Sequence, residues 1–551
     1  MERNLEALQS KPFDILVVGG GIYGAALLRE AAAQGLSAAL VEQADYVSGT
    51  SANSLKIIHG GLRYLQQADL PRVFESIRER SLLLRTAPHL VAPFPCLMPT
   101  TRALMKSRLV MWAGLLLNDI LSWNRNAGLV PSRRIPRGRT LSRRALLDIL
   151  PALRDTPATG AATWTDAFAY DSERLPLAMI RAATARGALA ANYVRADGFL
   201  LDGAQKRVLG IRATDLLSGR PLEIRAAVTI DAASEFSRGL LSTLPLRTTS
   251  PDVHLALAVN LILRTPPPAQ YGLGLQSAGS HRLYFIAPWR GLTLAGTYYR
   301  AHAGAPVPAA SIVTDADIDA YLDALNHCIP GTAWTRGDIA AIHAGLLPCA
   351  RPPEPDREPA LLHHSRITDH ARADGLEGLI SVCSIKYTTA RGIAENVIRL
   401  AARKLGRRTV PSPTRTEHLP GGDCGDPADY EKTLAAARPD VPPAELARLV
   451  RLYGSETKTL LDAAPAGSPP DALLRAELLR AIREEAPANL GDLLFRRTAW
   501  ASAGDIPEDR LTLAAAVMAA ERGWTDDRRQ SEAAAVRAAR TLWYPALAAQ
   551  P

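Results

Sequence analysis

A glycine-rich turn near the N-terminus constrains the fold of this chain more than any other feature. Residues 13–18 (FDILVV) are apolar and rich in β-branched side chains, which predicts a buried parallel strand. Residues 19–24 (GGGIYG) fit GxGxxG, and we expect a helix over residues 24–34 and a second strand over residues 38–42. A strand–turn–helix–strand unit of about 30 residues predicts a Rossmann-like α/β fold that binds a dinucleotide at the turn.

The residue types in this unit suit a dinucleotide for separate physical reasons. Gly19 permits the tight turn, Gly21 lets the backbone approach a pyrophosphate, and Gly24 allows the helix to pack closely on the strand. The helix N-terminus offers amide groups and a positive dipole to the phosphates. Glu42, at the end of the second strand, can accept hydrogen bonds from a ribose diol and would repel the 2′-phosphate of NADP. This pattern leaves FAD and NAD open, and a purely structural turn is the alternative.

Later segments extend this organisation. Residues 255–263 and 283–287 are strand-like and predict an antiparallel sheet that forms a separate substrate wall. A Pro/Gly-rich stretch at residues 408–426 is typical of a linker, and beyond it the segments have helical periodicity. Further expected strands lie at residues 227–232 and 378–382, and further expected helices at residues 472–485 and 510–523.

The net charge of the chain restricts the possible functions less than the glycine-rich turn does. The chain has 551 residues, enough for several domains, with 64 Lys+Arg against 55 Asp+Glu and a formal net charge of +9. This surplus fits acidic lipid headgroups, a phosphorylated substrate or an Arg-rich solvated surface. The sequence has no interleaving of basic and aromatic residues and no recognition-helix pattern, so we predict no nucleic-acid partner.

Five scattered cysteines form no CxxC pair and no cluster with histidine, which predicts no metal site and suits a reducing cytoplasm. The N-terminus has no apolar core of a secretory signal. The most apolar long stretch, residues 104–123, contains Lys106, Arg108 and Asp119, which are too costly for a spanning helix. It is either an amphipathic helix with Lys106, Arg108 and Arg125 near lipid headgroups or a core helix with exposed basic residues.

One segment carries a specific resemblance. Residues 45–65 (DYVSGTSANSLKIIHGGLRYL) closely resemble the signature of the FAD-dependent glycerol-3-phosphate dehydrogenase family. The resemblance covers nearly the whole chain and implies FAD rather than NAD. The other matching segments are residues 80–100, 285–289, 296–297, 386–391, 448–456 and 477–498.

The resemblance implies an enzyme that oxidises sn-glycerol 3-phosphate to dihydroxyacetone phosphate by hydride transfer to flavin. A quinone at the membrane surface is the implied electron acceptor, which gives a cytoplasmic protein with a peripheral membrane contact. The implied architecture is an oxidoreductase domain over residues 12–410 and an all-α domain over residues 427–551. Within the first domain we assign residues 12–95, 165–240 and 345–410 to FAD binding and residues 245–345 to the antiparallel substrate sheet.

The resemblance also implies roles for individual residues. His59 matches a position near the flavin, either as proton acceptor or to orient the Gly60-Gly61 loop. Tyr64 and Arg63 are the implied hydrogen-bond donor and anion contact for the substrate. His254 falls near a substrate-side histidine of the family, with a structural histidine as the alternative. The small polar loop beside the FAD pyrophosphate and flavin corresponds to Ser48, Gly49, Thr50, Ser51 and Ser54.

Lys386 and Thr388 match a flavin-contacting turn of the family. A lysine there would stabilise the reduced, anionic ring, and a threonine hydroxyl would bond its carbonyl.

The substrate half departs from the family pattern. Leu347 stands where the family has an arginine that binds the substrate phosphate, whereas Arg366 matches the second phosphate arginine. Residues 384–386 are Ser-Ile-Lys where the family has Gly-Gly-Lys. Two alternatives to glycerol-3-phosphate oxidation therefore stay open: a related flavin oxidoreductase acting on another alcohol or an amine, and a catalytically inactive flavin-binding scaffold.

Overall fold

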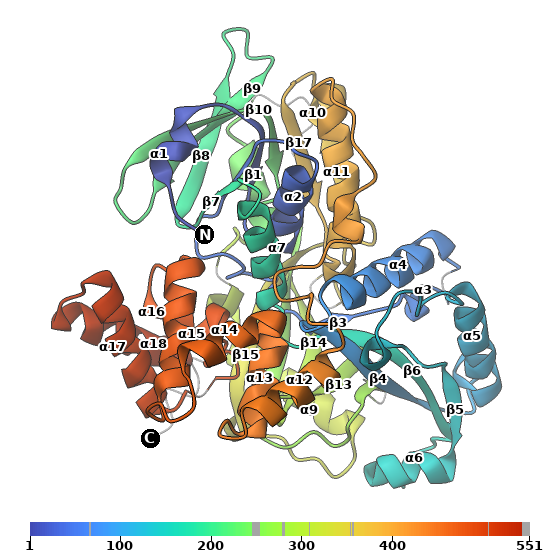
Figure 1. Ribbon diagram of the computed structural model, residues 1–551. Coiled ribbons are helices and arrows are strands. Elements are labelled where there is room, and N and C mark those ends of the chain that lie inside the picture. Colours follow the sequence, from blue (N-terminus) through green and yellow to red (C-terminus); the bar gives the residue numbers. More distant parts are fainter. Residues whose placement is uncertain are drawn as a thin grey trace.

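The computed structural model describes residues 1–65, 68–244, 254–277, 282–307, 309–352, 354, 357–504 and 506–542. Two large sheets stand end to end, and a group of helices from the C-terminal part packs beside them (Figure 1). The first residues of the predicted substrate sheet, 245–253, and the last of the predicted helical domain, 543–551, lie outside the described residues.

The first sheet is the predicted Rossmann-like sheet. Its strand order is β16-β17-β10-β1-β2-β7, with β1 parallel to both β2 and β10. Strand β1 is almost wholly buried because apolar layers cover both faces of the sheet. The strands are β1 (Phe13–Val18), β2 (Ala38–Val41), β7 (Leu189–Ala191), β10 (Pro221–Asp231), β16 (Arg366–Asp369) and β17 (Leu379–Cys383).

Helices cover one face of this sheet. Helix α2 (Ile22–Ala33) packs between α7 (Arg174–Thr184) and α11 (Ala390–Lys404), and all three share a core with alternate residues of β1. The opposite face is covered by β8 (Val194–Leu201), β9 (Val208–Asp215) and the first half of β10. The carboxyl ends of β1 and β2 therefore open toward the second sheet.

The second sheet contains the strands expected at residues 255–263 and 283–287 and recruits more of the chain than expected. Its order is β15-β11-β14-β13-β12-β4-β6-β3, with β5 paired to β6, and its pairs are antiparallel except β12 with β4. The strands are β3 (Ile57–Ile58), β4 (Val91–Thr100), β5 (Arg139–Ser142), β6 (Gly160–Ala169), β11 (Leu255–Leu263), β12 (Gly272–Gln276), β13 (Leu283–Trp289), β14 (Leu292–His302) and β15 (Ile339–Pro348).

Strand β3 and the first half of β4 lie within residues 12–95, which we assigned to FAD binding from the sequence. The second half of β4 continues to residue 100. They belong instead to the second sheet, because both pair with β6, a strand distant in sequence. Local periodicity carries no information about that partner. Helix α9 (Asp315–Cys328) covers the outer face of this sheet through Ile318, Tyr321 and Leu325.

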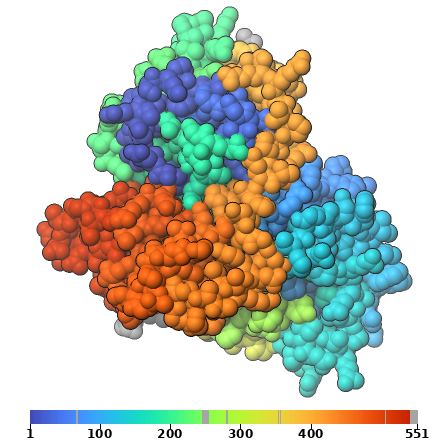
Figure 2. All heavy atoms as spheres, in the orientation of Figure 1, coloured from blue at the N-terminus to red at the C-terminus, as the bar shows by residue number. Residues whose placement is uncertain are grey.

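The C-terminal part is all-helical among its described residues, as predicted. Figure 2 shows it as a compact body against the first sheet and the neighbouring helices. The two domains are joined by buried ion pairs, among them the fork in which Arg174 donates to both carboxylate oxygens of Glu485 at 2.6 and 2.9 Å. Its main helices are α12 (Pro427–Ala437), α13 (Pro443–Tyr453), α14 (Thr457–Ala463), α15 (Ala472–Glu484), α17 (Glu508–Arg522) and α18 (Asp526–Leu542).

Helix α5 (Arg108–Leu121) stands at the outer edge of the molecule beside α4 (Leu70–Thr86) (Figure 1). It carries the largest group of exposed apolar side chains among the described residues. Leu115 is the one fully buried residue of α5, which excludes the core-helix alternative. Arg125 lies away from solvent in an ion pair with Asp119 at 3.0 Å, so its expected place near headgroups is wrong. The exposed apolar face of α5 and its flanks consists of Leu70, Phe74, Leu104, Met105, Leu109, Trp112, Leu116, Leu117, Ile120 and Trp123. None of the described helices has the length and hydropathy required to span a bilayer.

Candidate cofactor and substrate site

The turn after β1 has the close approach that a pyrophosphate needs. Gly19 has φ +108°, and a Cβ on Gly24 would lie 1.8 Å from the carbonyl oxygen of Gly19, so α2 starts against the turn with no room for a side chain. Ser51 accepts a hydrogen bond from the backbone N–H of Ile22 at 3.0 Å. The predicted polar loop thus reaches the N-terminus of α2 from a separate segment.

Glu42 lies at the end of β2, as predicted, and its carboxylate is tied to the turn. The backbone N–H groups of Gly20 and Ala44 donate to its two oxygens at 2.6 and 2.8 Å. Burial raises the pKa of Glu42, and these two hydrogen bonds oppose that effect. The carboxylate is thereby held at the place where the Rossmann pattern puts a ribose diol.

A cavity of about 2560 Å³ runs from this turn to the second sheet. That volume exceeds the usual 300–1,000 Å³ of a small-molecule pocket and has room for a dinucleotide together with a substrate. Thr388, whose buried hydroxyl has no hydrogen-bond partner among the described residues, also lines it. The glycine turn, the fixed carboxylate and this unpaired hydroxyl fit FAD. The predicted residues that line the cavity are Gly19, Gly21, Glu42, Ser48, Gly49, Thr50, Ser51, Ser54, His59, Arg63, Tyr64, Lys386 and Thr388.

At the far end of the cavity three predicted side chains surround one ring. The Nζ of Lys386 lies 4.3 Å from the centroid of the Tyr64 ring, and the His59 ring meets the same tyrosine edge-on at 5.7 Å. The guanidinium carbons of Arg63 and Arg72 lie 5.8 and 4.7 Å from the centroid of that ring. The segments 59–64, 72 and 386 thus bring a histidine and three cations to one wall.

Desolvation changes the charge of this wall. It lowers the pKa of His59 to about 4, against the opposing effect of Asp166, so the imidazole is neutral at pH 7. It also lowers the pKa of Lys386 to about 8, with Glu75 opposing and Arg72 reinforcing the shift. A neutral imidazole that can accept a proton therefore stands beside a lysine that is still largely protonated at pH 7.

The two alternatives for His59 differ in which group holds the Gly60-Gly61 loop. Asp166 accepts a hydrogen bond from the Gly60 N–H at 2.5 Å and another from Arg80 at 2.9 Å. His59 makes no hydrogen bond to any residue that the structure describes. Asp166 thus holds the loop, and the imidazole of His59 stays available to a ligand.

Three predicted residues lie outside the cavity lining. Gly24 lies beneath the turn and acts through packing. His254 precedes β11, where its carbonyl accepts from the Cys349 N–H at 2.7 Å, and it does not reach the cavity. Arg366 is exposed on the edge strand β16, opposite Cys383, and does not reach it either. Leu347, in contrast, lines the cavity from β15.

Sequence reasoning missed several polar residues of the cavity. Asn260 donates to the carbonyl of Asn53 at 2.9 Å and accepts from the hydroxyl of Thr297 at 2.8 Å, which ties the polar loop to the second sheet. Asp166, an acid within the otherwise apolar end of β6, is the one whose burial a strand pattern could have flagged. Further examples are Arg72, Arg282, Glu358 and His363, which no local pattern distinguishes.

Comparisons with known proteins agree with this geometry. A family described as "FAD dependent oxidoreductase" matches residues 14–400, and one described as "C-terminal domain of alpha-glycerophosphate oxidase" matches residues 412–529. The glycerol-3-phosphate dehydrogenase of Synechocystis sp. is 30% identical over 91% of this chain and 91% of its own length. That of Mycobacterium leprae is 31% identical over 89% of this chain and 82% of its own length.

A solved structure shares the fold. The glycerol-3-phosphate dehydrogenase from Bacillus halodurans, complexed with FAD, superposes with a TM-score of 0.77 at 24% identity and covers 98% of this chain and 96% of its own. The fold, the glycine turn and the matched segments lead to one assignment. This chain is an FAD-dependent oxidoreductase that belongs to the glycerol-3-phosphate dehydrogenase family.

Proposed function

We propose that this enzyme oxidises the secondary alcohol of sn-glycerol 3-phosphate to dihydroxyacetone phosphate. The observation that carries the proposal is the wall on which neutral His59 lies beside Arg63, Arg72 and Lys386 at one end of the FAD cavity. A base and an anion site in one place suit an alcohol that carries a phosphate. The names of the relatives support the same substrate.

The chain's residues divide the chemistry as follows. FAD, when bound, accepts the hydride and its two electrons. His59 accepts the hydroxyl proton, because its imidazole is neutral and has no other described partner. Arg63 binds the phosphate, Tyr64 orients the substrate, and Lys386 places positive charge where negative charge develops. Arg366 has no part in this proposal because it is exposed outside the cavity.

Replacing the proposed base tests the substrate and the mechanism together. We expect anaerobic glycerol 3-phosphate to bleach the bound FAD, and His59→Gln to slow that bleaching by about 10²–10⁴-fold, the usual contribution of a general base. FAD content should not change. Stopped-flow absorbance of the flavin gives the rate, and His418→Gln, at an exposed histidine outside the cavity lining, is the control.

No bleaching at millimolar glycerol 3-phosphate would reject this substrate. Bleaching by an unphosphorylated alcohol or an amine would instead favour the related oxidoreductase, and no bleaching by any of them would favour the inactive scaffold.

The leucine on β15 favours the other-substrate alternative, since it presents an apolar side chain to the cavity. Leu347→Arg should raise kcat/KM for glycerol 3-phosphate by about ten- to a hundredfold, the value of one hydrogen bond to a charged group. Leu347→Met keeps the volume without the charge and should change little. Steady-state kinetics of both variants measure this, and an arginine variant no better than wild type means that the phosphate binds elsewhere.

The lowered pKa of Lys386 predicts that the rate of FAD reduction by substrate depends on pH. Its pKa is lowered to about 8, so its positive charge is present below that pH and is lost as the pH rises through it. The rate of substrate-driven FAD bleaching should therefore fall above about pH 8 in the wild type. Lys386→Arg keeps its charge and should hold its rate to higher pH, whereas Lys386→Met should be slow throughout. A wild-type rate independent of pH between about 7 and 9 contradicts this role.

We also propose that α5 rests on an acidic lipid surface and that a quinone accepts the electrons there. The exposed apolar face of α5 is flanked by exposed Arg102, Lys106 and Arg108, a combination that binds anionic bilayers. The cavity extends under the same helix, where Met105, Val110 and other residues of this segment line it. This continuity supports a lipid-dissolved acceptor.

Vesicle flotation tests the membrane contact. The wild type should float with vesicles that contain anionic lipid, and the double variant Trp112→Glu/Ile120→Glu should bind them at least about tenfold more weakly, because each side chain contributes roughly 1.5–3 kcal/mol when buried. Val410→Glu, at an exposed apolar residue far from α5, is the matched control. A wild type that stays with the unbound fraction contradicts the proposal.

A further inference from the structure

The C-terminal helices supply one side chain to the FAD cavity. Among the described lining residues Arg496 is the one that comes from residues 412–529; the others belong to the oxidoreductase part. It lies in a π-helical turn, Leu493–Arg497, in which the N–H of Thr498 donates to the carbonyl of Leu493 at 3.0 Å. Such turns are rare and are frequent at functional sites.

The adjacent side chains of this turn reach one carboxylate. Arg497 donates from both terminal nitrogens to Asp45 at 2.6 and 2.7 Å, and the Nε of Arg496 donates to the same carboxylate. Asn192 adds a fourth hydrogen bond to this carboxylate at 2.9 Å. The side chains of Asp45 and Arg497 are both fully buried, and the two guanidinium groups hold the pKa of Asp45 well below its usual range. This carboxylate is therefore a fixed anchor between the domains.

Asp45 begins the loop that carries the predicted FAD-contacting residues. Val47, two positions on, has φ +62°, an unfavourable conformation for a β-branched residue, and its N–H donates to the carbonyl of Gly20 at 3.1 Å. Backbone strain of this kind persists where the surroundings hold it in place. The hydrogen bonds of Arg496 and Arg497 to Asp45 are one such restraint. Ser48, the first residue of the predicted polar loop, comes directly after Val47 in the sequence.

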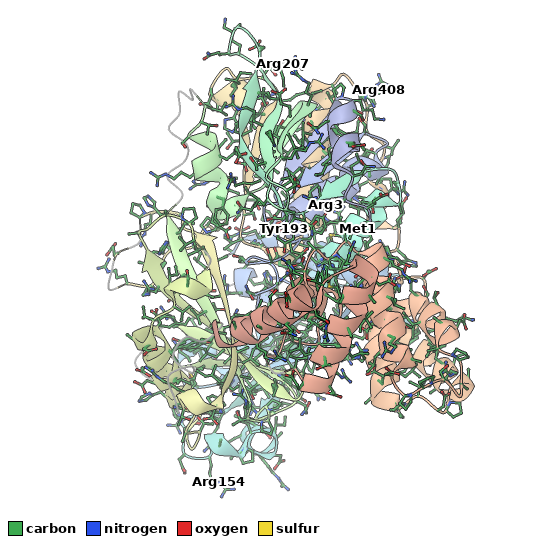
Figure 3. The ribbon with its side chains drawn as sticks, turned by 90° about the vertical axis from the view of Figure 1, so that its left-hand side faces the viewer. Met1, Arg3, Arg154, Tyr193, Arg207 and Arg408 are labelled. Carbon is green, nitrogen blue, oxygen red and sulfur yellow. The ribbon has the colours of Figure 1, made fainter. Side chains whose placement is uncertain are left out.

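Further hydrogen bonds surround the ion pairs of Asp45, where the C-terminal helices meet the first sheet. Tyr193 donates to Asp492 at 2.8 Å, and Asn489 donates to the Tyr193 hydroxyl at 2.7 Å. Arg3 donates to the carbonyl of Asn192 at 2.9 Å, and the amino group of Met1 donates to that of Glu484. Figure 3 labels Met1, Arg3 and Tyr193 close together where the C-terminal helices meet the first sheet.

Arg496 keeps one nitrogen for a ligand. Its Nε donates to Asp45 and its Nη2 to Asp492 at 2.6 Å, whereas Nη1 donates to no described residue. The residue lines the cavity together with Ala44 and Val194. The N–H of Val194 donates to the carbonyl of Glu42 at 2.8 Å, so this is the ribose end of the dinucleotide site.

We propose that Arg496 binds the adenosine half of FAD and that Arg497, acting through Asp45, positions the loop that holds the rest of the cofactor. The C-terminal helical domain is then a part of the cofactor site. Arg496 is the cofactor-binding residue and Arg497 the positioning residue. This proposal concerns FAD alone and does not depend on the substrate.

Ligand binding to the full-length apoprotein tests the assignment. FAD and ADP both carry the adenosine half, and FMN lacks it, so dissociation constants for the three ligands separate the two halves of the site. Arg496→Lys keeps a cation near Asp45 and Asp492 but loses the guanidinium fork. We expect it to weaken FAD and ADP binding by about tenfold or more, with FMN unaffected, since one hydrogen bond to a charged donor is lost.

Thermal unfolding separates binding from stability. The apo form of Arg496→Lys should unfold at a lower temperature than the wild type because two charge-assisted hydrogen bonds change, and its rise in unfolding temperature on adding FAD should be smaller than that of the wild type. Arg497→Lys should lower the unfolding temperature of the apoprotein and weaken FAD and FMN alike. If Arg496→Lys and Arg496→Gln both bind ADP as tightly as the wild type, Arg496 does not contact the adenosine half. An equal loss of FMN binding in the Arg496 variants overturns the proposal as well.

Discussion

The contact between the start of α2 and the end of β1 determines where everything else in the site can lie. With 1.8 Å between the Gly19 oxygen and the place of a Gly24 Cβ, the helix N-terminus sits directly on the turn. The amides of that turn then face the cavity, one of them bonds to Glu42, and Ser51 arrives at the same point from the polar loop. A side chain at Gly24 would separate helix from strand and move all of these groups. The site is therefore built outward from one backbone contact.

The second constraint is the burial of His59 and Lys386 on the cavity wall around Tyr64. The same desolvation that makes His59 a neutral acceptor also brings the pKa of Lys386 to about 8. The charge of Arg63 lowers both pKa values further, and that of Arg72 lowers the pKa of Lys386. Buried Asp166 opposes this at His59 and Glu75 opposes it at Lys386. The balance leaves a neutral imidazole and a largely protonated lysine on one wall at neutral pH, whereas a fully apolar cavity would favour the neutral form of both.

Local pattern was enough to predict the central strands of the first sheet and part of the second. The expected strands at residues 13–18 and 255–263 agree with β1 and β11 residue for residue, because apolar periodicity and bounding turns are properties of the segment itself. Partners distant in sequence were not predictable in this way: β4 joins the second sheet through β6, and Asp166 rather than His59 holds the glycine loop. Arg366 matched a motif, but the pairing of β16 at the edge of the sheet turns that residue away from the cavity.

The net charge of +9 is easier to interpret once the arginines are placed. Arg174 and Arg497 are buried against carboxylates of the other domain, and Arg391 is buried against Glu79 within the oxidoreductase part. These arginines are structural rather than available to ligands. Among the cations that do face the cavity, Arg72 and Arg63 already depress the pKa of Lys386. A further guanidinium at residue 347 would strengthen phosphate binding but would also lower the pKa of Lys386 if it came close. Leucine at this position adds no charge to the cavity and offers the phosphate no hydrogen bond.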